Sequence, residues 1–228
     1  MTRKKDLVLD TDALASGDDS RIAKEKRRIV RMGQGAIPLL AQYTTFPVAI
    51  VRCHVAYILG KIGGESTSTY LLALADDVVP EVQYDALAAM GDARASSTLP
   101  RLFAAVEMDD ETHGLSSAAA YSLTKFGTEA LPTALELVRS PIASIRSRLA
   151  LILGKIGGDQ AEIALRELLL DSEAQVRCDA LEGLVELSPT DLCDLLTTYV
   201  EGSDERLADL AGAWRVILKC PPVSRQSS

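Results

Sequence analysis

The sequence predicts an all-α fold in which about six helical hairpins stack as a right-handed α-α superhelix. Two observations lead to this fold class. A stretch of 18 residues recurs without a gap, because residues 47–64 align with residues 141–158 at an offset of 94 residues. Hydrophobic residues make up 47% of the 228-residue chain and aromatic residues only 4%. Leu, Ile, Val and Ala must therefore fill the interior, and these side chains suit close packing of helices.

Further copies of the repeated unit are expected between these two stretches, since 94 residues is about three times 31. Partial copies indeed begin at Pro80, His113 and Ala174. A period of about 30 to 33 residues is typical of a helical repeat array, in which each unit packs only on its neighbours.

Each copy has the apolar pattern of one long helix. Val51, Val55, Ile58, Leu59 and Ile62 fall at i, i+4, i+7, i+8 and i+11, on one helical face. The glycine pairs that follow, at 63–64 and 157–158, are expected to end these helices because glycine adopts positive φ at little cost. A second, shorter apolar helix is expected after each long one, at 71–74, 99–103, 131–137, 163–169 and 192–196.

Acidic or polar turns separate the hairpins, at 76–77, 109–110, 140–141, 171–172 and 202–204. We expect their oxygen atoms to cap the next long helix, a role favoured over a metal site. Arg52, Arg146 and Arg177 recur at one position of the repeat. This recurrence favours pairing with a loop carboxylate, or capping of carbonyl groups in a neighbouring unit, over direct ligand binding.

Residues 13–219 are expected to form a single repeat domain, with flexible ends at 1–12 and 220–228. The first long helix, near 18–32, contains the charged run Lys24-Glu25-Lys26-Arg27-Arg28 in place of an apolar stripe. This run is interpreted as the solvated face of a capping helix. The alternative is a basic patch, extended by Arg31 and by Arg3-Lys4-Lys5, that meets an acidic partner.

Charge and composition exclude several classes of protein. A net charge of −8, from 24 basic and 32 acidic residues, disfavours nucleic acid as a partner. No apolar run suits a membrane span or a signal peptide, so no membrane partner is expected. The four cysteines show no CxxC spacing and no disulfide-dense pattern, which favours a reducing compartment and a cytoplasmic location.

No catalytic residue, metal or cofactor is expected. The only histidines, His54 and His113, lie outside any HExxH motif, and GxxxxGK[ST], GxGxxG and GxSxG are missing from the sequence. The glycines of 60–64, repeated at 154–158, are interpreted as helix-ending residues rather than a phosphate loop. Cys53 and His54 are adjacent on a helix and point about 100° apart, so they cannot easily act as nucleophile and base.

The repeated pattern V-R-x-x-A-A-x-A-L-G-x-I-G resembles the HEAT-like repeats first associated with phycobilisome lyases. It is present in part at 51–63, 82–91, 115–127, 145–157 and 176–184. The resemblance covers most of 18–219 and implies the fold far more specifically than any activity. It also departs from the pattern in the middle of the chain, where Gln83 and Ser116 replace the usual arginine.

The resemblance implies that the helices carrying the V-R pattern line a concave groove, on the order of 50 Å long for six units. The side chains expected to face this groove and bind a protein are His54, Tyr57, Tyr84, Asp85, Tyr121, Arg148, Asp179 and Glu182. The three tyrosines are either a row of anchors for a partner or a cover for the edge of the core.

The sequence thus predicts a non-enzymatic scaffold or adaptor that holds a partner protein or peptide in the groove. The alternative, which depends on the resemblance alone, is an accessory subunit related to bilin lyases or phycobilisome-handling factors. The deoxyhypusine hydroxylases, which also have HEAT repeats, bind iron through His-Glu dipeptides. Neither histidine of this chain is followed by Glu, which excludes that activity.

Overall fold

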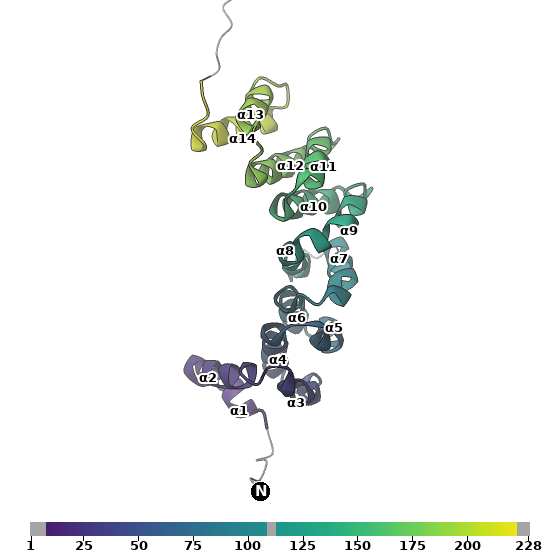
Figure 1. Cartoon of the computed structure of the whole chain (residues 1–228), viewed down its shortest axis with the longest axis vertical. Helices are drawn as coiled ribbons and strands as arrows, with labels where there is room; N and C mark the ends of the chain where they lie inside the picture. The colour runs from purple at the N-terminus through teal and green to yellow at the C-terminus, as the bar shows by residue number, and fades with distance from the viewer. Residues whose placement is uncertain (1–7, 109–112, 223–228) are drawn as a thin grey trace, which may run out of the picture. The chain divides into compact units, whose positions relative to one another are not determined.

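The computed structural model describes residues 8–108 and 113–222, and all regular secondary structure within these ranges is helical (Figure 1). The predicted all-α class is therefore confirmed. Contacts between residues divide the chain into two compact units, Met1–Phe126 and Gly127–Ser228. Each unit is described by itself, and the single repeat domain 13–219 stays a prediction. The ends 1–7 and 223–228 and the acidic turn at 109–110 lie outside the described residues.

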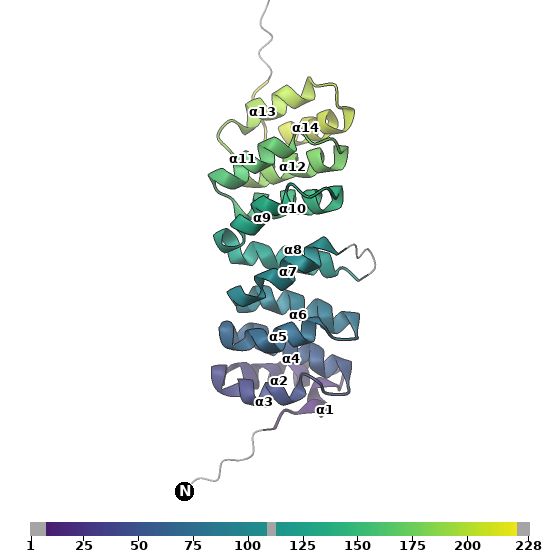
Figure 2. The same ribbon diagram turned by 90° about the vertical axis from the view of Figure 1, so that its right-hand side faces the viewer.

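The first unit is built from long helices that pack on one another, each followed by a shorter helix. Helices α4, α6 and α8 form successive contacts, with α5 and α7 packed against them (Figure 2). Helix α2 packs on α4 from the N-terminal side. The helices are α1 (Thr11–Leu14), α2 (Asp19–Val30), α3 (Ile37–Leu40), α4 (Ala49–Ile62), α5 (Ser68–Ala75), α6 (Pro80–Ala93), α7 (Leu99–Glu107) and α8 (Leu115–Phe126).

The second unit repeats the arrangement. Helices α10 and α12 pack on each other, α11 covers both of them, and α14 packs on α12 and α13. The helices are α9 (Leu131–Leu137), α10 (Ala143–Ile156), α11 (Asp159–Leu168), α12 (Ala174–Leu187), α13 (Leu192–Val200) and α14 (Glu205–Ile217).

The predicted apolar stripe forms the core of each unit. Val51, Val55, Ile58 and Leu59 of α4 are fully buried. Helix α4 ends where the sequence predicts, because Gly63 adopts a φ of 73° directly after Ile62. A glycine with positive φ also ends α10, whereas Arg94 and Ser188 adopt positive φ at the ends of α6 and α12.

The first glycine of the Gly-Lys-Ile-Gly segment has a different role from the one predicted. Gly60 and Gly154 lie inside their helices, where the next long helix approaches closely. A Cβ atom on Gly154 would lie 2.5 Å from the Cα atom of Gly183 in α12, and one on Gly60 would lie 2.9 Å from Ala89 in α6. These glycines permit backbone contact between successive helices, so their interpretation as helix-ending residues is corrected.

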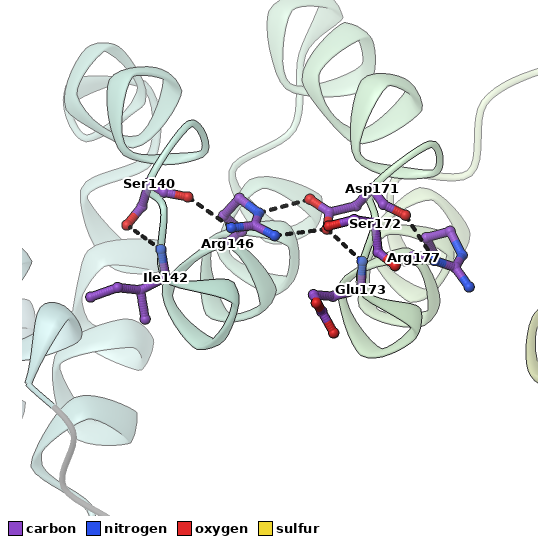
Figure 3. A network of polar contacts seen from close by, with 7 residues as sticks. All are labelled: Ser140, Ile142, Arg146, Asp171, Ser172, Glu173 and Arg177. Atoms are coloured by element: carbon purple, nitrogen blue, oxygen red, sulfur yellow. Dashed lines mark hydrogen bonds and ion pairs between the residues drawn. The ribbon is translucent and has the colours of Figure 1, made fainter.

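The recurring arginines join successive turns of the repeat, as predicted. Nε and Nη2 of Arg146 donate to the two carboxylate oxygens of Asp171 at 2.7 and 2.8 Å, while Nη1 donates to the carbonyl oxygen of Ser140 at 2.8 Å (Figure 3). Arg177 continues the chain, since its Nη1 donates to the carbonyl oxygen of Asp171 and its Nε to the carboxylate of Asp204. The turn at 171–172 therefore accepts hydrogen bonds from two arginines.

The same bonds occur in the first unit. Arg52 donates to both carboxylate oxygens of Asp77 and to the carbonyl oxygen of Phe46. Both side chains are about nine-tenths buried, and the guanidinium group lowers the pKa of the Asp77 carboxyl against the opposing effect of burial. Gln83, at the arginine position of α6, retains only the bond to the turn, to the carbonyl oxygen of Asp77.

Capping of the long helices differs from the prediction. The carboxylates of Asp18 and Asp204 cap α2 and α14. However, α4, α6, α10 and α12 begin after Val48, Val79, Ile142 and Glu173, which make no side-chain capping bond. Asp77 and Asp171 instead direct their carboxylates at arginine and at the backbone N–H two residues on, because the ion pair is the stronger interaction.

Both ends of the array differ from the predicted flexible segments. Leu9 is buried and Asp10 caps α1, so ordered structure begins before residue 13. Cys220 forms a disulfide with Cys193 across 27 residues of sequence, which ties residue 220 to α13. The cysteine pattern, which favours a reducing compartment, does not predict this bond. The pairing arises because α14 returns the chain to α13, which cysteine spacing alone does not reveal.

Replacing Arg52 by Gln should lower the free energy of unfolding by about 3 kcal/mol at neutral pH, because the buried Asp77 carboxylate loses its partner. The folded-state pKa of Asp77 is lowered from 3.8, so this stabilisation is present above that value and is lost as the pH falls through the folded-state pKa. Urea denaturation at neutral and acidic pH should therefore show a difference from wild type that shrinks in acid.

Lys155→Gln is the control for this measurement. Lys155 and Glu186 lie 3.4 Å apart with both side chains about half exposed, so the change should cost less than about 0.5 kcal/mol. Equal losses in the two variants would contradict a special role for the buried pair.

Replacing Gly154 by Ala should destabilise the second unit by about 1 to 3 kcal/mol, because the new methyl group meets the backbone of Gly183. Gly212→Ala in α14 is the control. Its Cβ atom would lie 3.9 Å from Val200, an ordinary contact, and alanine favours the helix by about 0.5 to 1 kcal/mol. The Tm of Gly154→Ala should fall and that of Gly212→Ala should rise. An unchanged Tm in Gly154→Ala would refute the close contact between the helices.

Candidate functional site

Three tyrosines define the candidate site, a surface of the first unit that we call the tyrosine face. Tyr57 of α4 and Tyr84 of α6 are each 43% exposed, and Tyr121 of α8 is 61% exposed. Tyr57 and Tyr121 occupy the same repeat position, and Ala88 occupies it in α6. Tyr84 precedes Ala88 by four residues and so lies on the same side of α6, one turn earlier. Three successive helices thus each present one phenol ring.

A row of charged residues runs beside the tyrosines, at one repeat position. Asp92 of α6 accepts hydrogen bonds from Lys61 of α4, at 2.7 Å, and from Lys125 of α8. Burial would raise the pKa of the Asp92 carboxyl, but the two lysines outweigh burial and lower it. The charge row therefore carries one uncompensated positive charge and ties three successive helices together.

Lysines also lie over the exposed rings. The ammonium group of Lys26 in α2 lies 4.3 Å from the centre of the Tyr57 ring, and that of Lys61 lies 5.5 Å away. Lys125 lies 4.6 Å from the centre of the Tyr121 ring. Cation–π attraction holds both rings in place, which lowers the entropy that they would lose on binding a partner.

His54 and Asp85 lie deeper than the tyrosines. Burial and the nearby Lys26 lower the pKa of His54 to about 4, so its imidazole is neutral at physiological pH. Its Nε2 atom is buried and has no hydrogen-bond partner among the described residues. Burial raises the pKa of the Asp85 carboxyl, although a hydrogen bond with Cys53 and the charge of Lys26 oppose this. Both residues thus lie near Lys26, beneath the exposed rings.

The comparisons with known proteins concern the fold. No protein-family model and no curated protein matches the sequence. Among solved structures, YibA of Escherichia coli is similar over 95% of this chain and 88% of its own, with a TM-score of 0.50 and 17% identity. The complex of CpcE and CpcF of phycocyanin lyase from Nostoc is similar over 77% of this chain and 74% of its own, with a TM-score of 0.50 and 21% identity.

The chain has the fold of a HEAT-like repeat protein. A structure of human deoxyhypusine hydroxylase with glycerol is also similar, at 14% identity and a TM-score of 0.42 over 92% of this chain and 94% of its own. The predicted repeat class is confirmed. At these low sequence identities, the similarity concerns the fold alone.

The other three predicted binding residues, Arg148, Asp179 and Glu182, lie in the second unit. Asp179 of α12 is buried, and its carboxylate accepts hydrogen bonds from Ser147 and from Gln175. Glu182 is exposed as a whole residue. Partial desolvation of its carboxyl raises the pKa of that group, and the charge of Asp179 adds to this effect. Arg148 of α10 is half-buried. The binding roles of these residues stay predictions, and the internal bonds of Asp179 leave it poorly placed to meet a partner.

Sequence reasoning missed the lysines of the site. The sequence pattern places Lys26 on the solvated face of a capping helix and Lys61 in a helix-ending segment, and it predicts a binding role for neither. The missed signal was the alternation of charge at a single repeat position, Lys61, Asp92 and Lys125 in successive units. Alternating charge at equivalent positions of neighbouring helices predicts ion pairs across the array.

Cys53 and Cys178 occupy equivalent positions on α4 and α12 and are buried free thiols. Burial and the neighbouring Asp85 raise the pKa of the Cys53 thiol to about 12, and burial also raises the pKa of Cys178. Thiolate is the reactive form, so both thiols are poor nucleophiles. Among the described residues, no three His, Cys, Asp or Glu side chains form a group that could hold a metal ion.

Thiol titration should report both the disulfide and the two buried thiols. With Ellman's reagent at about pH 8, the folded, unreduced chain should react slowly because its free thiols are buried and protonated. Unfolding without a reductant should release two thiols, and reduction should release all four. Four thiols in the unfolded, unreduced chain would show that Cys193 and Cys220 do not pair.

Proposed function

We propose that this HEAT-like repeat chain is a non-enzymatic scaffold that binds a segment of a partner protein on its tyrosine face. The observation that carries this proposal is the presence of three exposed phenol rings, one on each of the long helices α4, α6 and α8 of one unit. Tyrosine is enriched at interface hot spots. Its large ring loses little conformational freedom on binding, and its hydroxyl group can form hydrogen bonds with a partner or with water.

The spacing of the rings suits an extended or helical segment. Neighbouring packed helices lie about 8 to 10 Å apart. The rings on α4, α6 and α8 therefore span a surface longer than a small metabolite. Lys26 and Lys125, which lie over the rings of Tyr57 and Tyr121, add positive charge to the same surface. A protein interface usually combines such apolar and charged groups.

The alternative of a bilin-lyase accessory subunit is favoured only by the likeness to the CpcE and CpcF complex. That likeness concerns the fold, and no residue of the tyrosine face indicates that a bilin is bound.

The cellular location of the chain stays a proposal. No described helix has the length and apolar character needed to cross a membrane. The disulfide weighs against the cytoplasmic location expected from the sequence.

The test compares partners captured by the tagged wild-type chain and by a Tyr57→Ala, Tyr84→Ala, Tyr121→Ala variant. Losing three hot-spot rings should weaken binding by about 3 kcal/mol or more, a change of at least about a hundredfold in Kd. A matched control, Val78→Ala, Ile163→Ala, Leu170→Ala, removes exposed apolar atoms elsewhere and should retain the partners.

Identical partner lists from the tyrosine variant and the wild type would refute the proposal, provided that circular dichroism shows the same helical content. A phycobiliprotein subunit among the captured proteins would favour the accessory-subunit alternative.

A further inference from the structure

Helix α2 divides its charged residues between two sides. Glu25 is buried, accepts a hydrogen bond from the backbone N–H of Asp10 at 2.9 Å and pairs with Arg28 at 2.6 Å. Arg28 also donates to the carbonyl oxygen of Val8. These two residues therefore hold the N-terminal segment and α1, and they leave the remaining cations of α2 to another surface.

Three of the remaining cations, Lys26, Arg27 and Arg31, line a hollow of about 670 Å³ between α2 and α4. None of these three forms an ion pair with any described residue. Lys61 also lines the hollow, where its charge is compensated by Asp92, and Asp19 is the one carboxylate in the lining. The hollow thus has three cations outside any ion pair of the described residues and one carboxylate, in a chain whose net charge is −8.

Apolar groups also line the hollow. Ile22 and Val30 of α2 are half-buried, and the ring of Tyr57 connects the hollow to the tyrosine face. Burial lowers the pKa of Lys26, although its charge is favoured by Asp85. The ammonium group is thus partly desolvated, and a carboxylate placed beside it would restore lost interactions.

We propose that this hollow binds an acidic segment of a partner protein, with carboxylates on Lys26, Arg27 and Arg31 and an apolar side chain on Ile22 and Val30. The inference rests on the proposed function and specifies the chemistry of the partner. Charge complementarity favours separate carboxylates over a nucleic acid, because a continuous phosphate backbone would be repelled by the strongly acidic remainder of the chain.

The test measures fluorescence anisotropy with the full chain and a labelled peptide of about ten Glu and Asp residues that has one central Leu. Arg27→Gln, Arg31→Gln should weaken binding by about tenfold or more, because two charge-assisted hydrogen bonds are lost. Arg21→Gln, Lys24→Gln is the matched control, since it removes the same charge from exposed positions of α2 outside the lining. It should change Kd by less than about threefold.

Equal weakening in the two variants would reduce the effect to general charge attraction and overturn the proposal. Failure of the wild type to bind the peptide at low salt would also overturn it, as would tighter binding of a single-stranded DNA of similar length. Capture experiments separate this inference from the proposed function. If the tyrosine variant loses partners and Arg27→Gln, Arg31→Gln keeps them, the scaffold stands and the acidic-segment inference fails.

Discussion

At Arg52, Arg146 and Arg177, one guanidinium group joins two consecutive turns, and these bonds fix how the hairpins that carry them stack. Arg146 binds the turn before its own helix and the carboxylate of the next turn, 25 residues further on. A buried carboxylate is unfavourable without a partner, and a buried guanidinium group has five donors to satisfy. By directing both at turns, the repeat satisfies its buried charges and fixes how far each hairpin lies from the next. The small residues at the helix contacts then have a defined partner, as Gly154 has Gly183.

The parts of the fold that the sequence predicted are those set by local pattern. The stripe from Val51 to Ile62 fixes a helix, and Gly63 ends it, because both properties belong to neighbouring residues. The arginine role was also predictable, since a charged residue that recurs at one repeat position has a recurring partner. The roles of Gly60 and of Cys220 were not predictable, because each depends on a backbone or side chain that is distant in sequence.

The candidate site was predicted in part for the same reason. Tyr57, Tyr84 and Tyr121 are exposed because their repeat positions fix their direction, and their binding of a partner stays a prediction. Asp179 was expected to face a partner, yet its carboxylate accepts bonds from Ser147 and Gln175 within its own unit. The lysines around the tyrosines escaped notice because a lone lysine on a helix is usually solvated. Only the pairing of Lys61 and Lys125 with the same carboxylate gives them meaning.

The arginine bonds are unevenly distributed, and this has a consequence for cooperativity. In a repeat array, stability is approximately a sum of intrinsic terms and nearest-neighbour coupling terms. Helices α4 and α10 have a two-oxygen arginine bond to the turn that follows, whereas Gln83 and Ser116 cannot form one from α6 and α8. Contacts among α4, α6 and α8 therefore depend on a different ion pair, in which the Asp92 carboxylate is shared by Lys61 and Lys125. One carboxylate thus couples all three helices that carry the tyrosines, so local opening at this surface should involve the three helices together.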